Sequence, residues 1–428
     1  MSWIFGTSTD WIDLSNDVVA AATGTSLQSV DSIAAGGTGY AVDNILTLSG
    51  GTGTISAQVE VTSVSAGAVT GVRIYQAGLY SAAPGDPVAT TGAGSGCTLN
   101  CTFATNGWTA ERNTAYSGSE REVILNGSGD GGDEIFIGWR TYSSVPGDYY
   151  NWELNGFTGF DSGLTTPQQP GVSPGKWNAA SGFRAGAYLP LDNASIGYAM
   201  SITPYRIILV AIVGSSYFNA ILGWANRYAT EGEFPYPLLV GGCMSEFNGT
   251  SGSSGLRSGL VDPWRTAGTE GQDRGPMFIR STDGTWIEVR NAQISGSTKT
   301  ESRTCVVIPA GRPDGSINGA VSPQNDRFTL VDASWGEVIP LTAAIGASTA
   351  NLQPTPGTLN RTLLFPATIV LSTPAKQILA DLPDVFWISG FGAIGSEDRI
   401  RIPGGAAYRV FQNCNRTENY AYLAVKEI

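Results

Sequence analysis

The chain contains no histidine among its 428 residues. Histidine is the usual general base near neutral pH, a common zinc ligand and the middle member of hydrolytic triads. Its absence excludes a large group of catalytic mechanisms and most zinc sites. We therefore expect a protein that is not an enzyme, and the sequence nominates no catalytic, cofactor-binding or metal-ligating residue and no cofactor.

Charged residues are also scarce, since they make up 14% of the chain, whereas glycine alone numbers 56. This composition lacks the Glu, Lys and Arg that cover exposed helical faces, and it is rich in turn formers. The net charge of -12 offers no source for the phosphate neutralisation on which nucleic-acid affinity mostly depends. We predict a mainly β protein with no nucleic-acid partner.

Cysteine is limited to five residues without a C-x-x-C pair, so reduced, buried thiols are expected. The five are Cys97, Cys101, Cys243, Cys305 and Cys414. The N-terminus has no basic segment ahead of a long apolar run and does not resemble a secretory signal. These features favour a protein that is made and kept in a cytosol.

One segment is apolar enough to be weighed as a membrane span. Residues 207–225 carry no charge and lie between Arg206 and Arg227. Gly214 to Ser216 and Asn219 interrupt the run, however. We predict a buried strand at 207–213, followed by a turn and a second element, and no membrane span.

The remaining periodicity predicts one amphipathic helix near the N-terminus and many strands after it. Apolar residues at 11, 12, 14, 18 and 19 fall on one helical face. A hairpin around Gly404-Gly405 is expected at 399–410, and residues 166–175 and 248–255 are typical of loops. Further strands are predicted at 134–142, 286–290, 304–308, 363–371, 385–391 and 420–425.

Residues 30–103 contain an imperfect duplication with a period of about 40 residues. Each copy has two apolar residues, a corner ending in tyrosine, an apolar strand, a Gly-rich turn and an alternating apolar stretch. The first copy comprises Val30, Ile33, Gly37 to Tyr40, Ile45 to Leu48, Gly50 to Gly53, Ala57, Val59 and Val61. The second comprises Val69, Val72, Ala77 to Tyr80, Val88, Gly92 to Gly96, Cys97, Leu99, Cys101 and Phe103.

This pattern predicts two hairpin-like units that pack face to face, with glycines supplying the turns. Cys97 and Cys101 then lie on one face of a strand, with sulfurs about 13 Å apart, so they are core residues and not a disulfide. We expect residues 26–105 to form a small all-β domain inserted into a β-sandwich-like body. That body comprises a helical segment at 1–25 and residues 106–428, with a subdivision near 248–259.

Two short motifs resemble chemical sites. Gly127 to Gly132 matches G-x-G-x-x-G, but a strand pattern follows it where a nucleotide site needs a helix. The acids Asp130, Asp133 and Glu134 are hard ligands that suit calcium, although a solvated hairpin turn gives the same pattern, and both interpretations stay open. Ser173 stands in a G-x-S-x-G match inside a Pro-rich segment, which favours a loop residue.

Aromatic clusters at Tyr149, Tyr150 and Trp152, and at Phe234 to Pro237, suit core packing or subunit contacts, with sugar binding as the alternative. A glycosidase needs only two carboxylates and is compatible with the lack of histidine. Nothing among the 36 acids singles out such a pair. A capsule depolymerase is therefore retained as a minor alternative.

Several ordered blocks resemble a family of virion structural proteins of tailed bacteriophages. They lie at residues 131–142, 148–160, 207–213, 217, 221–223, 228–230, 233–242, 386–392 and 408–413. The resemblance covers 108–428 and the N-terminal helix, and residues 26–105 are similar to Gly-Tyr-rich repeats of phage fibre and decoration proteins.

The resemblance implies a structural component of the virion, of the tail or baseplate, that is made in the host bacterial cytoplasm. Its partners would be other virion proteins and copies of itself. A fibre, collar or head-decoration protein that binds host-surface glycan is the alternative. The family carries no catalytic motif that could be transferred to this chain.

Overall fold

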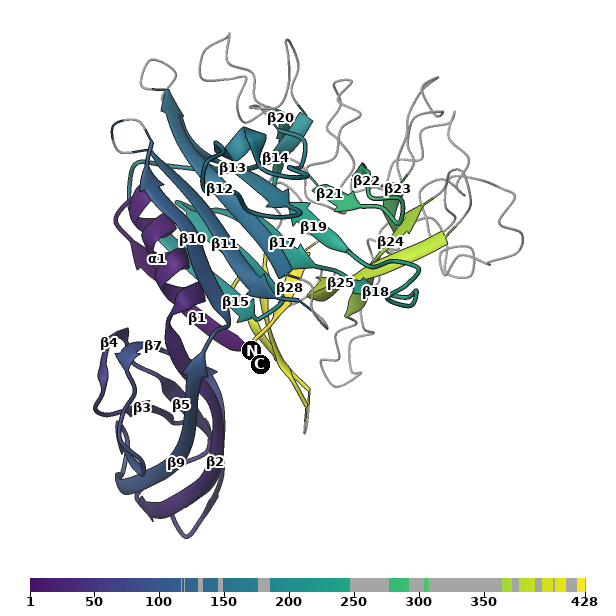
Figure 1. The fold of residues 1–428 in the computed structure, drawn as a ribbon. Helices are drawn as coiled ribbons and strands as arrows, with labels where there is room; N and C mark the ends of the chain where they lie inside the picture. Colours follow the sequence, from purple (N-terminus) through teal and green to yellow (C-terminus); the bar gives the residue numbers. More distant parts are fainter. Residues whose placement is uncertain are drawn as a thin grey trace, which may run out of the picture.

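The structure is a computed structural model. It describes residues 1–116, 118, 120–129, 134–144, 149–175, 185–246, 277–291, 304–307, 364–371, 377–388, 395–402, 405–412 and 422–427. Within these ranges the fold is mainly β, as expected, with one α-helix and three sheets (Figure 1). The expected subdivision near 248–259 lies outside the described residues.

The largest sheet has 14 strands and is antiparallel except where β22 runs parallel to β23. In spatial order it contains β1 (Ser2–Ser8), β15 (Ile196–Thr203), β16 (Arg206–Val213), β17 (Ser216–Trp224), β19 (Leu238–Gly241), β21 (Met277–Arg280), β22 (Trp286–Asn291), β23 (Thr304–Val307), β24 (Phe365–Leu371), β25 (Gln377–Ile388), β28 (Tyr422–Lys426), β27 (Ala407–Phe411) and β26 (Arg399–Arg401). The short β18 (Asn226–Arg227) pairs with β25.

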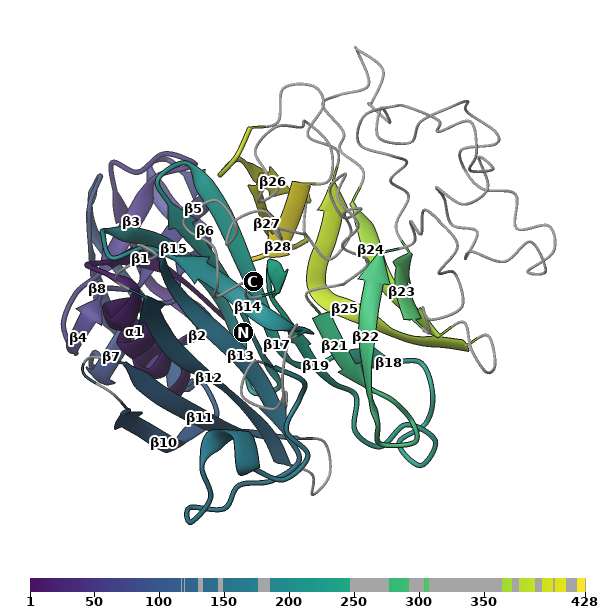
Figure 2. The ribbon, with the colours of Figure 1, turned by 90° about the horizontal axis from the view of Figure 1, so that it is seen from above.

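A six-stranded antiparallel sheet packs against one face of this large sheet (Figure 2). Its spatial order is β10 (Trp108–Ala115), β11 (Arg121–Ser128), β12 (Glu134–Ser144), β13 (Tyr149–Phe157), β14 (Ala185–Leu191) and β20 (Met244–Glu246). We call these two sheets, together with the helix, the body.

The central strands of the large sheet are buried on both faces. Along β16, Ile207 and Leu209 belong to the core shared with the six-stranded sheet, whereas Ile208 and Val210 belong to a second core on the opposite side. A strand between two cores has no polar face, which explains the long apolar run. The predicted strand and turn are confirmed, and the predicted second element is the strand β17; among the described residues no helix is long and apolar enough to cross a membrane.

The predicted helix is confirmed as α1 (Trp11–Thr23). The Asp10 carboxylate caps its N-terminus by accepting hydrogen bonds from the backbone N–H groups of Ile12 and Asp13. The helix lies between the sheets, where its backbone and Ser15 accept hydrogen bonds from the indole N–H groups of two tryptophans in the six-stranded sheet. A strand, β1, precedes the helix; it is apolar on both faces and shows no alternation, so its sequence carried no strand signal.

The predicted body strands fall on β12, β16, β22, β23, β24, β25 and β28 where the structure describes them, and the predicted hairpin is β26 and β27. Residues 166–175 form the expected loop, which includes the short 3-10 helix η2 (Thr166–Gln168). One physical reason explains these successes: the strands are rich in β-branched and aromatic residues and are bounded by turn formers.

The third sheet, which we call the module, comprises Thr25 to Thr105 and curls around its own core (Figure 1). Its spatial order is β4 (Thr52–Ile55), β7 (Leu79–Ala82), β2 (Thr25–Thr38), β9 (Ser95–Thr105), β8 (Val88–Thr91), β3 (Ile45–Leu48), β5 (Gln58–Ser65) and β6 (Ala68–Gln76).

The two sequence copies are joined within this single sheet, and the expected face-to-face packing of two hairpin units was wrong. The first strand of each copy pairs with the last strand of the other copy, as β2 pairs with β9 and β6 with β5. The copies also meet where β3 pairs with β8. This exchange of strands was missed because periodicity identifies strands but not their partners.

Two buried tyrosines reveal the symmetry of the module. The Tyr40 hydroxyl of the first copy accepts a hydrogen bond from the backbone N–H of Cys97 at 3.2 Å, and the Tyr80 hydroxyl of the second copy accepts one from Ala57 at 2.7 Å. A glycine lies beside each ring, since a Cβ added to Gly94 would come within 2.7 Å of Tyr40 and one added to Gly78 within 2.8 Å of Tyr80. Each copy therefore completes a backbone hydrogen bond of the other.

We predict that Tyr40→Phe and Tyr80→Phe destabilise the module to a similar extent. Each change leaves a buried backbone N–H without its acceptor, at a cost of about 1–3 kcal/mol. Hydrogen exchange should accelerate around Cys97 in the first variant and around Ala57 in the second. The control is Tyr228→Phe, because Tyr228 is 60% exposed and its loss should stay within about 0.5 kcal/mol. Unchanged exchange around both amides would contradict the prediction.

Candidate functional site at the seam between the module and the body

The module joins the body through two neighbouring connections. The backbone N–H of Asn106, just after the module, donates to the carbonyl of Gly24, just before it, at 3.1 Å. The Asn106 side-chain oxygen accepts from Ser2, Ser26 and Gln28, and its amide nitrogen donates to the Ala21 carbonyl. The two ends of the module are therefore tied together and to the helix.

A second contact fixes the module beside strand β1. The backbone N–H of Ala77 donates to the Trp3 carbonyl, and the side-chain amide of Gln76 donates to the Phe5 carbonyl, each at 2.8 Å. The Tyr75 ring meets the Phe5 ring edge to face, with centroids 5.7 Å apart. The module thus supplies partners for an edge that β15 does not cover.

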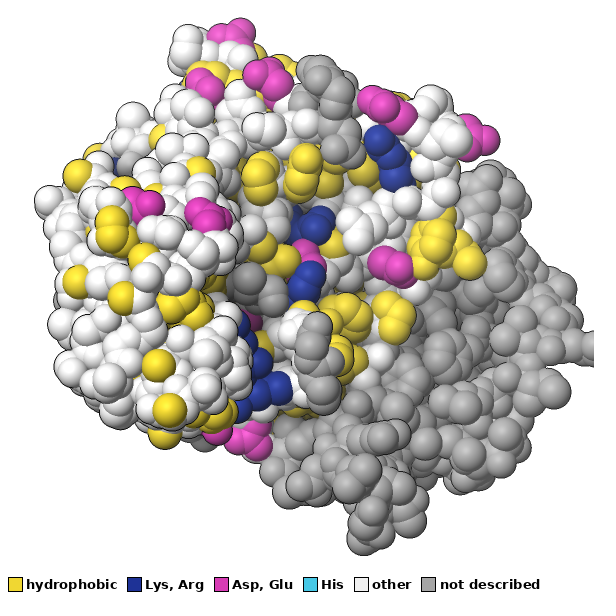
Figure 3. All heavy atoms as spheres, turned by 90° about the horizontal axis from the view of Figure 1, so that it is seen from below, with side chains coloured by type: hydrophobic (Ala, Val, Ile, Leu, Met, Phe, Trp, Pro, Cys, Tyr) yellow, Lys and Arg dark blue, Asp and Glu magenta, His cyan; other side chains and the backbone are white. Residues whose placement is uncertain are grey.

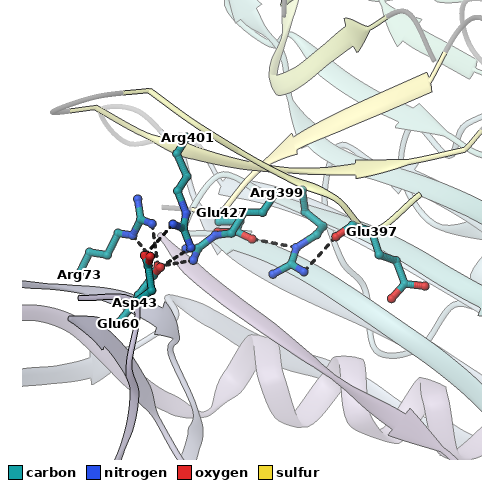
Figure 4. Close-up of polar contacts among 8 residues, drawn as sticks. Asp43, Glu60, Arg73, Glu397, Arg399, Arg401 and Glu427 are labelled. Atoms are coloured by element: carbon teal, nitrogen blue, oxygen red, sulfur yellow. Dashed lines mark hydrogen bonds and ion pairs between the residues drawn. The ribbon is translucent and has the colours of Figure 1, made fainter. Parts of the chain in front are cut away.

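The third contact is an ion-pair network centred on Glu60 of β5 (Figure 4). Arg73 is the cross-strand neighbour of Glu60, and its Nε lies 2.7 Å from the carboxylate. From the body, Arg399 and Arg401 of β26 also donate to Glu60. The Glu60 side chain is only 1% exposed, so three guanidinium groups compensate one buried carboxylate.

The network continues into the body through Arg399. This guanidinium also pairs with Glu427, which in turn accepts from Arg409, the cross-strand neighbour of Arg399. Glu427 is 1% exposed. The guanidinium carbons of Arg399 and Arg409 lie 5.0 and 6.0 Å from the centre of the Tyr75 ring, which adds cation–π attraction between body and module. We call this whole contact surface, between β5 and β6 of the module and β1, β26 and β27 of the body, the seam.

Towards solvent the network ends at Asp43, which is 64% exposed and pairs with Arg401 at 2.9 Å. Exposed ion pairs contribute little, so the energetic weight lies with the buried carboxylates. Figure 3 shows basic side chains gathered in the hollow of this face of the molecule, whereas much of the surrounding surface is uncharged.

The electrostatics favour the ionised form of Glu60. Burial alone would raise its pKa, but the hydrogen bond from Arg73 and the positive charges of Arg399, Arg73 and Arg401 outweigh burial, and the pKa is lowered. The ionised Glu60 therefore holds the module to the body through ion pairs. The arginines of the network are paired with the carboxylates of Glu60, Glu427 and Asp43.

The acidic loop considered for calcium is only partly described, because Asp130 and Asp133 lie outside the described residues. Glu134 is exposed at the start of β12, and its carboxylate accepts a hydrogen bond from Asn126 at 3.1 Å. Among the described residues no group of three or more acidic or cysteine side chains could hold a metal ion. The calcium interpretation itself stays open.

The remaining candidates have structural environments. Ser173 is a buried loop residue that accepts a hydrogen bond from the Gly156 backbone, as the loop interpretation predicted. Trp152 stacks on Trp139 in the core with centroids 5.2 Å apart, and Phe234 is fully buried, so neither ring can stack on a sugar. Tyr150 is half-buried against Trp11, and Tyr149 has no described side chain.

The described cysteines Cys97, Cys101 and Cys243 are free thiols, as expected. Cys97 is buried, and Cys101 is half-buried next to Asp86 and Asp31. Burial, followed by these two negative charges, raises the pKa of Cys101 to about 12. This thiol is therefore protonated and unreactive near neutral pH.

Sequence reasoning missed the network. Glu60 lies between Val59 and Val61 in an alternating strand, a position that normally faces solvent. The one available signal was Arg399-Ile-Arg-Ile, which places two arginines on the same side of a strand. Nothing in the sequence indicated that these arginines, more than 300 residues later, would cover Glu60.

Comparison with known proteins gave no match, either among protein-family models or among curated proteins.

We predict that Glu60→Gln loosens the seam. The change leaves Arg73, Arg399 and Arg401 facing a neutral amide, and breaking a buried pair typically costs about 3–5 kcal/mol. Hydrogen exchange should accelerate in β1, β5 and β26. Glu231→Gln is the matched control, since Glu231 is 58% exposed and 4.0 Å from Arg227. Equal behaviour of the two variants would refute a central role for Glu60.

We also predict that acid weakens the seam through Glu60. Its folded-state pKa lies below the ordinary value of 4.5, so its contribution is complete above that value and is lost as the pH falls through the lowered pKa. Hydrogen exchange of the backbone amides in β1, β5 and β26 is measured between about pH 7 and about pH 3 and corrected for intrinsic rates. It should rise only at the acid end of this range. The Glu60→Gln variant should lack that dependence; an identical acid response in both would assign it to other groups.

Proposed function

We propose that this chain is a structural subunit of a tailed-bacteriophage particle, in the tail or baseplate. It acts through its interfaces with copies of itself and with other virion proteins, in several symmetry-related positions. It is synthesised in the host bacterial cytoplasm and retained in the virion, and it performs no catalysis.

The observation that carries this proposal is the fixed attachment of the module. A domain on a flexible linker samples many orientations. Here two tied connections, the contact with β1 and the buried network around Glu60 hold the module against the body. A particle component must present the same surface in every copy, and a clamped insert meets that requirement.

The location of the resembling blocks supports the same proposal. Residues 131–142, 148–160, 207–213, 386–392 and 408–413 overlap β12, β13, β16, β25 and β27 where they are described. These are paired strands of the body, with side chains in its cores. The resemblance therefore concerns residues that determine the fold and not only exposed loops.

The decisive experiment is to locate the protein after phage infection. We expect it to co-sediment with intact particles purified on a density gradient, in an integer ratio to the other tail proteins, by quantitative mass spectrometry. Gold-labelled antibody against the module should mark one region of the particle in electron micrographs. Recovery only from the lysate supernatant, never from purified particles, would refute the proposal.

A further inference from the structure

The edge of the large sheet at β1 has the properties of a latent pairing site. β1 is the terminal strand of the 14-stranded sheet and pairs with β15 along its whole length. Its seven residues, Ser-Trp-Ile-Phe-Gly-Thr-Ser, contain no charge and no proline. Sheet edges of this kind pair readily with another strand unless something covers or interrupts them.

The module covers this edge. The carbonyls of Trp3 and Phe5 point away from β15, since they accept hydrogen bonds from Ala77 and Gln76 of the module. Backbone groups alternate in direction along an antiparallel strand, so the N–H and C=O groups of Thr7 also point away from β15. Two of the carbonyls that a neighbouring strand would need, those of Trp3 and Phe5, are therefore occupied by the chain's own insert.

We propose that the module is an autoinhibitory cap, and that the β1 edge, once uncovered, pairs with β1 of a second copy of this chain. A second copy suits this edge because the strand has no charge to repel itself. Antiparallel pairing about Phe5 would also place two identical edges in a closed two-fold arrangement. The result would be one continuous sheet across two subunits.

The network around Glu60 controls access to this edge. Glu60 and Arg73 lie on β5 and β6, and β6 ends at Gln76; Gln76 and the next residue, Ala77, are the two that contact β1. Arg399 and Arg401 hold those strands from the body side. Separating the charges would withdraw the cap while leaving β1 and its pairing with β15 intact. This inference goes beyond the proposed function, since it holds for any assembly that contains the chain.

Two full-length variants test the proposal. Glu60→Arg places a fourth guanidinium among Arg73, Arg399 and Arg401, whereas Arg399→Glu creates repulsion from the body side and leaves the module sequence unchanged. For each we expect the mass in sedimentation equilibrium to double relative to the parent chain under the same conditions. Glu231→Arg, at an exposed position, is the control and should leave the mass unchanged.

A second substitution identifies the surface responsible. Thr7 is exposed on β1, and a lysine there places a charge on the pairing edge. Added to Glu60→Arg or to Arg399→Glu, Thr7→Lys should return the mass to that of the parent chain. Introduced alone, it should leave the mass of the parent chain unchanged. Dimers that persist with Thr7→Lys would overturn the assignment to β1.

Hydrogen exchange distinguishes a failed cap from a failed fold. The two variants should keep slow exchange in β16 and β17, which lie in the body core. If exchange in β6 rises while the mass stays at the parent value, the edge is uncovered and does not pair, and the proposal is wrong. This outcome is independent of whether the protein is found in phage particles.

Discussion

The structure depends on a sheet whose central strands are buried on both faces. β16 and β17 place alternate residues in two separate cores, so neither strand has a side that water can reach over most of its length. Such strands cannot exchange partners without exposing both cores. Among the described residues, the surfaces left for contacts with other molecules therefore include the sheet edge at β1, the outer surface of the six-stranded sheet and the module.

The module is held against the body, beside β1, by buried ion pairs around Glu60 as well as by apolar contacts. Glu60 costs free energy when it is removed from water, and that cost is offset only while arginines from both sides surround it. An apolar seam would tolerate sliding, because hydrophobic contact is not directional. Hydrogen-bonded guanidinium groups require one geometry, so this seam specifies orientation as well as attachment.

The parts of the fold that were predictable from sequence are those determined by local pattern. Trp11, Leu14 and Val18 define the helix by their spacing, and the run from Ile207 to Val213 defines a buried strand by its lack of polar residues. Partners were not predictable, since pairing between β2 and β9 depends on residues about 70 positions apart. The Glu60 network was hidden for the same reason: its two halves lie at opposite ends of the chain, and each half alone is typical of a solvated strand.

The exchange of strands inside the module also constrains how its gene can change. Repetitive coding sequence is prone to recombination that deletes one repeat. Here such a deletion would remove the strand that pairs with the surviving copy's first or last strand, together with the tyrosine that accepts its backbone hydrogen bond. A shortened gene would encode only one side of this strand exchange, and the two copies must therefore be inherited together even as their sequences drift apart.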